Sequence, residues 1–495
     1  MGIYTCRFGA LVALMLCNLP TYSSAFSDLE NFVRVQGSID SNSSVVNYRN
    51  GSVFWKQPGY NLTKIFNFEG FNINRKLKQP DGTYLSLSRE FMVYRDPVAS
   101  QILQVWINPS SKQPNEVFYF TNDPANFPIK SPPPSGFTQT ADDPIIMYHV
   151  DSILEYENPL SPDKYSNYSA GEFYDAVDIF GYFANYTTLQ QSSEHSLPMA
   201  GSWMRKSQFL PWMEMGNTPG SIYYNTLSWK CKSGLSCISD DIMQIINTAY
   251  PKYKNAPTTA EEPNQTSWDI FKKVIEQRRQ AGLPDIIISP VEITTNSSTM
   301  AYNVDERVEK IIYNAFPLFF HVNATAFPEV AGKQSVPLFD LRGNIAFDYE
   351  PIPGQNAYRL QFDGYFLAYN HTSGAPLKNI TNPYTGAVNK LPVYFPLEVD
   401  YVFPSDSFYT IDMPDAEAVG LLAAQSVETV GRDGTGDTEI YTVNLLSLVF
   451  PYEELPKTPN EAKFYGTYTM FQNFPEWMEM GDIQGSLIYR ASVSN

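Results

Sequence analysis

Two copies of one short motif carry the most conspicuous carboxylates of this 495-residue sequence. "PWMEMGNTPGSIYY" and "PEWMEMGDIQGSLIY" each place a glutamate, Glu214 or Glu479, between two methionines. A carboxyl group in apolar surroundings has a raised pKa and can act as a general acid, as in glycosidases. The alternative is structural, because a duplicated motif also marks a fold landmark. In a strand, Glu214 would share a half-exposed face with Trp212, which favours the structural interpretation.

A second pair of candidate residues lies in the charged part of the first half. Arg89 and Glu90 are adjacent, so in a strand they point to opposite faces and one of them can lie inside a barrel. A buried arginine needs a partner, and an arginine–carboxylate pair can be a core contact or an anion-binding feature. Glu69 and Arg89 are therefore further candidates for a site.

Metal and cofactor chemistry find little support. The histidines are His149, His195, His321 and His371, and none has the spacing of a zinc site. No GxSxG, Walker or Rossmann fingerprint is present. Residues 433–439, "DGTGDTE", have a calcium-like composition without the spacing of an EF-hand. We predict no cofactor and no metal.

The N-terminus has the features of an export signal. Arg7 precedes an apolar run at residues 8–19, and residues 23–25 supply small side chains before a cleavage site. We expect the mature chain to start at Phe26. No later stretch approaches the roughly 18 to 20 apolar residues that a spanning helix needs. The sequence predicts a secreted, extracellular protein without a membrane span.

Two further features agree with export from the cell. Cys231 and Cys237 remain after removal of the signal, and in an oxidising compartment they can close a small loop as a disulfide. The chain also contains ten sequons for N-glycosylation, at Asn42, Asn50, Asn61, Asn167, Asn185, Asn264, Asn296, Asn323, Asn370 and Asn379. We predict a disulfide-bonded glycoprotein.

Composition limits the fold and the partners. Apolar residues make up 43% and charged residues 17% of the chain, so packed cores are expected rather than disorder. A formal net charge of -18 without a cluster of lysines and arginines argues against nucleic acid as a partner.

The repeated motif indicates two similar domains in tandem. Trp212 aligns with Trp477 and Tyr94 with Tyr369, at offsets of 265 and 275 residues, and an Asn-Pro pair follows each tyrosine. Solenoid units repeat at about 20 to 50 residues, so this longer period indicates whole domains.

Local patterns predict antiparallel strands in both copies. "TYLSLSREFMVYRD" is rich in β-branched and aromatic residues, and we expect "QILQVWINP" to return beside it and "NEVFYFTNDP" to follow. The predicted fold class is all-β, with two tandem antiparallel barrel-like or sandwich-like domains, a lipocalin-like barrel being one form. Residues 130–140 are expected to form a loop with room for a lid.

Helical patterns occur between the copies. Ser239 is the expected N-cap of one helix, and a second is expected to start at Thr266 or Ser267 and to end before Gly282. We therefore expect a signal peptide at 1–25, a first β domain at 26–230, a helical connector packed on it at 231–305 and a second, diverged β domain at 306–495.

Several motifs of the first half resemble the domain of unknown function 1838 family. They are "NFVRVQGSID", the stretch from "FNFEGFN" to "VYRDP", "VWINP", "NDPANF", "PWMEMGNTPGSIYY" and "TSWDIFKK". The resemblance covers roughly Asn31 to Lys273, and the second copy keeps only "NPYTG" and "WMEMGD". The family brings no established reaction, cofactor or catalytic residue.

Three classes of function remain. The first is a binder of a small apolar or aromatic molecule, favoured because barrels can enclose ligands and the chain has 33 Tyr and 32 Phe. The second is a cofactor-independent enzyme, such as an isomerase, cyclase or hydrolase, that acts on a secreted metabolite or glycan. The third is a structural acidic glycoprotein of an extracellular matrix, including a mineralised one.

Overall fold

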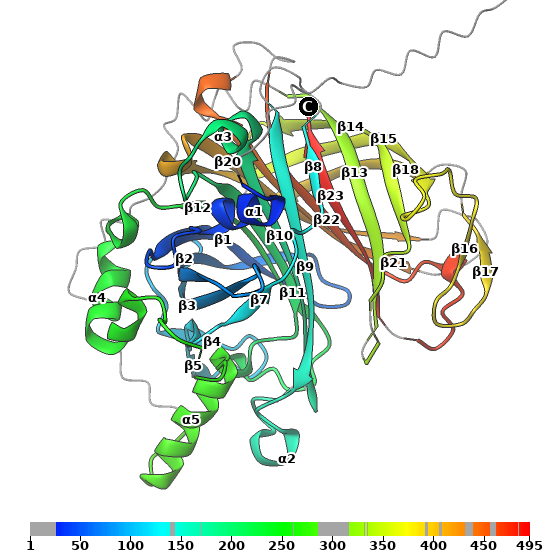
Figure 1. Ribbon diagram of the computed structural model, residues 1–495. Coiled ribbons are helices and arrows are strands. Elements are labelled where there is room, and N and C mark those ends of the chain that lie inside the picture. The colour runs from blue at the N-terminus through cyan, green and yellow to red at the C-terminus, as the bar shows by residue number, and fades with distance from the viewer. Residues whose placement is uncertain are drawn as a thin grey trace, which may run out of the picture.

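The computed structural model describes residues 26–138, 144–169, 171–260, 262–285, 316–330, 332–333, 335–391, 395–404, 408–430, 439–455, 462–483 and 485–495. The predicted signal peptide at 1–25 lies outside them. Within this part of the chain, two large antiparallel sheets dominate, and few helices accompany them (Figure 1). The prediction of an all-β fold is confirmed.

The first sheet contains strands from the first half of the chain only. In order across the sheet they are β6 (Phe120–Asn122), β3 (Tyr84–Arg95), β2 (Thr63–Lys78), β1 (Val45–Lys56), β12 (Ser221–Lys230), β11 (Ala200–Ser207), β10 (Phe173–Asn185), β9 (Ile145–Glu157) and β8 (Ser135–Phe137). A further short strand, β7 (Phe127–Ile129), pairs with β3.

The second sheet repeats this order strand for strand. It runs β18 (Phe395–Pro404), β15 (Ala357–Tyr369), β14 (Phe339–Pro351), β13 (Leu318–Glu329), β23 (Ser486–Ser494), β22 (Tyr465–Asn473), β21 (Glu439–Pro451), β20 (Ala418–Val430) and β19 (Phe408–Met413). In each sheet the last long strand of the copy pairs with its first, β12 with β1 and β23 with β13. The duplication read from the sequence is thus a duplication of topology.

Each sheet is accompanied by one small hairpin at the same place in the chain. These hairpins are β4 (Val105–Ile107) with β5 (Pro114–Glu116), and β16 (Asn379–Thr381) with β17 (Val388–Lys390). The expectation that "QILQVWINP" returns beside β3 is wrong, because after one bridge at Ile102 this stretch leaves the sheet to form β4.

The two repeated landmarks of the sequence meet in space. Asn108 Nδ2 donates to the carbonyl O of Met213 at 2.8 Å, and Asn382 Nδ2 donates to that of Met478 at 2.6 Å. Each asparagine Oδ1 also accepts two backbone N–H groups of its own Asn-Pro turn. One asparagine therefore fastens the tip of the small hairpin onto the "WMEM" turn in each copy.

Two details of the alignment need correction. Asp96 and Asn370 occupy the same turn position, since each Oδ1 accepts from the amides two and three residues further on, so the pairing of Tyr94 with Tyr369 is wrong by one residue. The "WMEM" stretch is a 3-10 turn in both copies rather than a strand. Its glutamates have left-handed backbone, with φ of 52° at Glu214 and 49° at Glu479.

The helices between the copies form as predicted. Helix α4 (Asp240–Ala249) follows Ser239, and α5 (Ser267–Gln280) begins with a capping box between Thr266 and Asp269. The apolar face of α4 packs on the outer side of β2 and β3, while α5 packs beside the other end of the first sheet (Figure 1). The domain boundaries themselves stay a prediction.

Three short helices that the sequence patterns did not indicate also cover the first sheet. They are α1 (Asp28–Gln36), α2 (Pro162–Tyr165) and α3 (Tyr186–Gln191). Helix α1 has a Ser27–Glu30 capping box and buries Phe32, Val33 and Val35. None of the helices in the described residues is long and apolar enough to cross a lipid bilayer.

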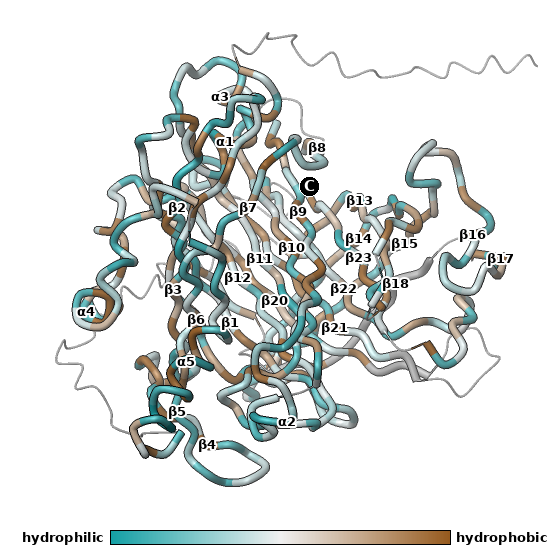
Figure 2. The backbone as a smooth tube through the Cα atoms, turned by 60° about the horizontal axis from the view of Figure 1, so that its bottom comes forward, coloured by the Kyte–Doolittle hydropathy of each residue, from teal (hydrophilic) through white to brown (hydrophobic). Residues whose placement is uncertain are grey.

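The two sheets pack against each other through β10–β12 and β20–β22, which lie side by side in both views (Figures 1 and 2). Asn225 on β12 donates to the carbonyl oxygens of Ala423 and Leu446 and accepts from the Ser447 hydroxyl. A side chain on Gly181 would lie 2.7 Å from Thr467 Oγ1, so the strands approach closely there. The two sheets are therefore closely packed here and joined by specific polar contacts.

We expect Asn108→Ala to destabilise the fold. The change leaves a buried carbonyl and two turn amides without their partner, which costs about 2 kcal/mol. Asn382→Ala should cause a similar loss, whereas Asn217→Ala, at an exposed position of the neighbouring turn, should cause none. Denaturant unfolding measures all three. Equal stability of the Asn108 and Asn217 variants would contradict this role.

Candidate functional site

The inner face of the first sheet carries an unusual mixture of charged and aromatic side chains. Phe68 on β2 contacts Trp203 on β11, with ring centroids 5.8 Å apart, although two strands separate them in the sheet. The sheet therefore curls around this face (Figure 1). We call the residues at its centre the Arg49 site: Arg49, Asn72, Glu90, Asn122, Asp178, Phe180, Tyr182, Trp203 and Arg205.

Register brings these residues together. Asn72 on β2 lies opposite Glu90 on β3, and Phe180 on β10 lies opposite Trp203 on β11. Because side chains alternate between the two faces along each strand, all of these residues point to the same face of the sheet. Arg49, Glu90, Phe180 and several neighbours remain partly exposed although the curled sheet surrounds them, so water-accessible space adjoins them.

Arg49 is held by stacking. Its guanidinium carbon lies 4.3 Å from the centre of a ring of Trp203 and 5.8 Å from that of Phe180. It forms no hydrogen bond with any residue that the structure describes, and its Nε is buried without a partner. Burial lowers the pKa of Arg49, and the nearby Glu90 carboxylate partly opposes that effect.

Glu90 is fixed by two amides. Asn72 Nδ2 donates to one carboxylate oxygen at 3.2 Å, and Asn122 Nδ2 donates to the other at 2.7 Å. Asn122 is itself positioned by α5, because its Oδ1 accepts from the backbone N–H and the hydroxyl of Ser267. The connector helix thus helps to position a carboxylate on the inner face.

An ion pair between Arg205 and Asp178 lies at the aromatic end of the site. Arg205 donates to both carboxylate oxygens of Asp178 at 2.9 Å, and Trp203 Nε1 donates to the same carboxylate at 2.8 Å. Burial alone would lower the pKa of Arg205, but Asp178 raises it well above its usual value. The opposite charges of Arg205 and Asp178 therefore neutralise each other. The adjoining core is aromatic, with Phe66, Phe68, Tyr94, Trp212 and Tyr224 packed together.

The opposite end of the inner face is polar. Lys76 Nζ donates to Gln36 of α1 and to Ser86, each at 2.8 Å, and Gln36 donates in turn to the Tyr182 hydroxyl. Burial lowers the pKa of Lys76 to about 7. Lys230 donates to carbonyl oxygens at the end of α1, and burial lowers its pKa as well. Helix α1 therefore closes this end.

A separate groove of about 920 Å³ lies between the two sheets. Strands β8 and β9 line one side, and β13, β14 and β23 line the other. The His149 ring contacts the Ser492 hydroxyl across it, and Arg490 lies 3.5 Å from Asp151. Burial, with Arg490 nearby, lowers the pKa of His149. The segment predicted as a loop at 130–140 includes β8, which forms one rim of the groove.

Glu69 and Arg89 both lie on the outer face of the first sheet. Glu69 accepts from Tyr48 and Arg95, and Arg95 also binds Asp241 at the start of α4. Arg89 binds Asp123 and the carbonyl O of Asn255. These contacts attach the connector to the sheet. Of the adjacent pair Arg89 and Glu90, it is Glu90 that faces inward.

Glu214 and Glu479 lie far from each other, each at the end of its "WMEM" turn. Glu214 is partly buried, and burial together with the charge of Asp285 raises its pKa. Glu479 is exposed. Neither belongs to the Arg49 site, and a catalytic role for either stays a prediction.

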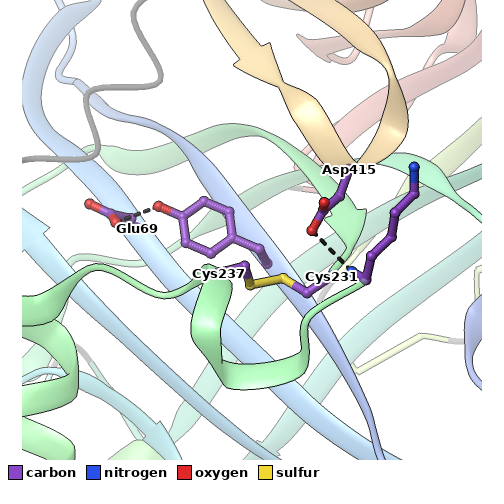
Figure 3. The surroundings of a disulfide bond; sticks show 6 residues. Glu69, Cys231, Cys237 and Asp415 are labelled. Carbon is purple, nitrogen blue, oxygen red and sulfur yellow. Dashed lines mark hydrogen bonds between the residues drawn. A yellow bond between two sulfur atoms is a disulfide. The ribbon is translucent and has the colours of Figure 1, made fainter.

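Cys231 and Cys237 form the predicted disulfide. Figure 3 shows it with Glu69 and Asp415 on its two sides, and Asp415 accepts from the backbone N–H of Lys232. The disulfide loop thereby contacts the second half of the chain.

Most of the sequons lie at positions that a glycosylating enzyme could reach. Asn296 lies outside the described residues, and the other nine are exposed or partly exposed. Occupancy of these sites stays a prediction.

Among the described residues, no group of three or more His, Cys, Asp or Glu side chains has the geometry of a metal site. Residues 433–438 of the calcium-like stretch lie outside the described part of the chain. His371 Nδ1 lies 2.8 Å from Asp340, at the rim of the groove.

Sequence reasoning missed the centre of the site. Arg49, Asp178 and Arg205 belong to no recognisable motif, and Arg49 lies about 130 to 155 positions from the Phe180 and Trp203 rings that it contacts. A signal that could have found it is a polar or charged residue at an inward-facing position of a strand that is otherwise apolar. Arg49 in "VVNYRNGSVFWK" is such a residue.

The fold and the site define an all-β protein built from two copies of one curled antiparallel sheet, with a charged and aromatic inner face in the first. Residues 42–275 match the sequence model of a family described as "Protein of unknown function (DUF1838)". This span contains β1 to β12, α4 and most of α5, so the resemblance to that family is confirmed for the first part of the chain.

Other comparisons add little. No curated protein matches the chain. A crystal structure of a protein of unknown function from the DUF3598 family of Nostoc punctiforme is 7% identical, with a TM-score of 0.24 over 95% of this chain and 99% of that one. A crystal structure of Pseudomonas aeruginosa OccK2 in complex with glucuronate is 7% identical, with a TM-score of 0.15 over 91% and 96% of the two chains. Scores this low support no argument about fold or function.

Lys76 should make stability depend on pH. Its pKa is about 7 in the folded protein and about 10.4 in an unfolded chain. Between these values the unfolded chain binds the extra proton, so the free energy of unfolding rises with pH, by about 1.4 kcal/mol per unit. From about pH 7 to 9, wild type should gain about 2 to 3 kcal/mol relative to Lys76→Met.

The control is Lys78→Met, on the same strand but exposed. Its unfolding free energy should follow that of wild type through this pH range. Parallel pH profiles for wild type and Lys76→Met would show that Lys76 keeps its charge when buried.

Proposed function

We propose that this protein binds a small organic ligand, with an apolar or aromatic part, on the inner face of its first sheet. The observation that supports this most strongly is the set of partly exposed Arg49, Glu90, Phe180 and Tyr182 inside a curled sheet. An isolated core would be expected to hide the aromatic rings and to exclude the charges. Ligand sites combine apolar walls with a few fixed polar groups in this way.

The fixed polar groups support binding. Glu90 is restrained by two amides, and Arg49 is restrained by stacking on Trp203. Preorganised groups lower the entropic cost of binding. The family match covers the whole first sheet, which agrees with a function located there rather than in the second copy.

We also propose that the protein is exported and N-glycosylated. The exposed sequons and the Cys231–Cys237 disulfide support this proposal. A cofactor-independent enzyme and an acidic matrix glycoprotein are the alternatives, and the experiments below separate them from a binder.

The first experiment is native mass spectrometry of the enzymatically deglycosylated protein, purified from its own source. We expect a stoichiometric extra mass below about 1 kDa, the size of a ligand that such a site can hold. Conversion of the released compound on incubation with fresh protein would identify an enzyme. A mass equal to that of the bare chain, unchanged by an extract of the source tissue, would favour the matrix glycoprotein.

A pair of variants on one strand locates the ligand. Ser152 on β9 faces inward, opposite Asp178, whereas Glu155 faces the groove between the sheets. Ser152→Trp should fill space beside the Arg49 site and abolish the extra mass, and Glu155→Trp should leave it. Thermal unfolding must show that both variants fold. Loss of ligand from the Glu155 variant alone would move the site to the groove.

A further inference from the structure

The arginines of the first half differ sharply in how they are satisfied. Arg34 donates to three carbonyl oxygens and to Asn31, Arg95 binds two carboxylates, and Arg205 binds Asp178 through two hydrogen bonds. Arg49 alone among these four has no hydrogen-bond acceptor in the described residues. Its Nε is buried without a partner, whereas the side chain as a whole is partly exposed, so a ligand or water can reach the guanidinium and supply acceptors.

The neighbouring carboxylates do not fill this role. Asp178 is already bound by Arg205 and by Trp203 Nε1. Glu90 is bound by the amides of Asn72 and Asn122, and no ion pair joins it to Arg49. The positive charge of Arg49 is therefore left without a contacting negative charge, and Arg205 nearby adds to the positive potential.

We infer that Arg49 receives the carboxylate of the ligand, and that the ligand is an organic acid with a flat apolar body. A guanidinium presents parallel donors that match the two oxygens of a carboxylate. Phe180 continues the surface that Arg49 stacks on, since its ring is nearly parallel to those of Trp203 and Tyr182. This inference rests on the proposed function and names its ligand class.

The surroundings also limit the charge of the ligand. Glu90 faces the same space with a restrained carboxylate, so a second anionic group near it would be repelled. The site therefore fits one carboxylate rather than a phosphate ester or a diacid.

Calorimetry with matched probes tests this directly. Naphthalene-2-carboxylate and naphthalene-2-carboxamide share shape and apolar area and differ in charge. At about pH 7, wild type should bind the acid at least about tenfold more tightly than the amide, as expected for a charge-assisted pair. Equal binding of the two, or no binding of the acid at about 1 mM, overturns the inference.

Variants of Arg49 add a second readout. Arg49→Met should remove the preference for the acid without weakening the amide, and Arg49→Lys should keep only part of it, because an ammonium lacks the paired donors. Since Arg49 has no internal acceptor, Arg49→Met should leave the melting temperature unchanged or raise it. Arg205→Met, which leaves the buried Asp178 carboxylate without its ion-pair partner, should lower the melting temperature. A large stability loss from Arg49→Met would instead indicate a structural arginine.

The two proposals fail differently. A neutral compound released from the source protein, or equal binding of acid and amide that Ser152→Trp abolishes, would overturn the role of Arg49 and leave the binding site in place. Acid binding that survives Ser152→Trp and Arg49→Met would overturn both.

Discussion

Strand β12 takes part both in the first sheet and in its contact with the second sheet. It pairs with β1 on one side and β11 on the other, and so joins the start of the first copy to its end. Its inward side chains, such as Tyr224, belong to the aromatic core, whereas Asn225 binds backbone carbonyls of the second sheet. Because adjacent residues of a strand point to opposite faces, one strand supports the curl of one sheet and the contact with the other. The "WMEM" turn leads directly into it.

The residues that are conspicuous in the sequence have structural contacts in this fold. Glu214 and Glu479 occupy the same left-handed position in the two copies, directly after the methionine whose carbonyl accepts from Asn108 or Asn382. Glu69 and Arg89 are charged, yet they serve to attach the connector. The residues of the Arg49 site are unremarkable in the sequence, and in the register of the second sheet Asn444, Tyr468 and Met470 take the places of Asp178, Trp203 and Arg205. One copy thus carries the candidate site, while the other supports it across a tightly packed interface.

The four charged side chains of the Arg49 site are held in different ways. Arg205 and Asp178 satisfy each other, Glu90 is held by neutral amides, and Arg49 is held by aromatic rings. Folding alone gains little from holding an arginine in this way, because its buried Nε has no hydrogen-bond partner. A feature that costs stability and is held rigidly is a candidate for function.

The sequence alone allowed the all-β class, the duplication, both connector helices and the disulfide to be predicted, because these follow from periodicity, capping residues and short spacing. It also placed Arg89 and Glu90 on opposite faces. Only the tertiary structure decided which of them faces inward, since that depends on the direction in which the sheet curls. It likewise decided that Arg49 meets Trp203 and Phe180, about 130 to 155 positions away. Contacts across non-adjacent strands arise from the curl of the sheet, which leaves no periodic signal in the chain.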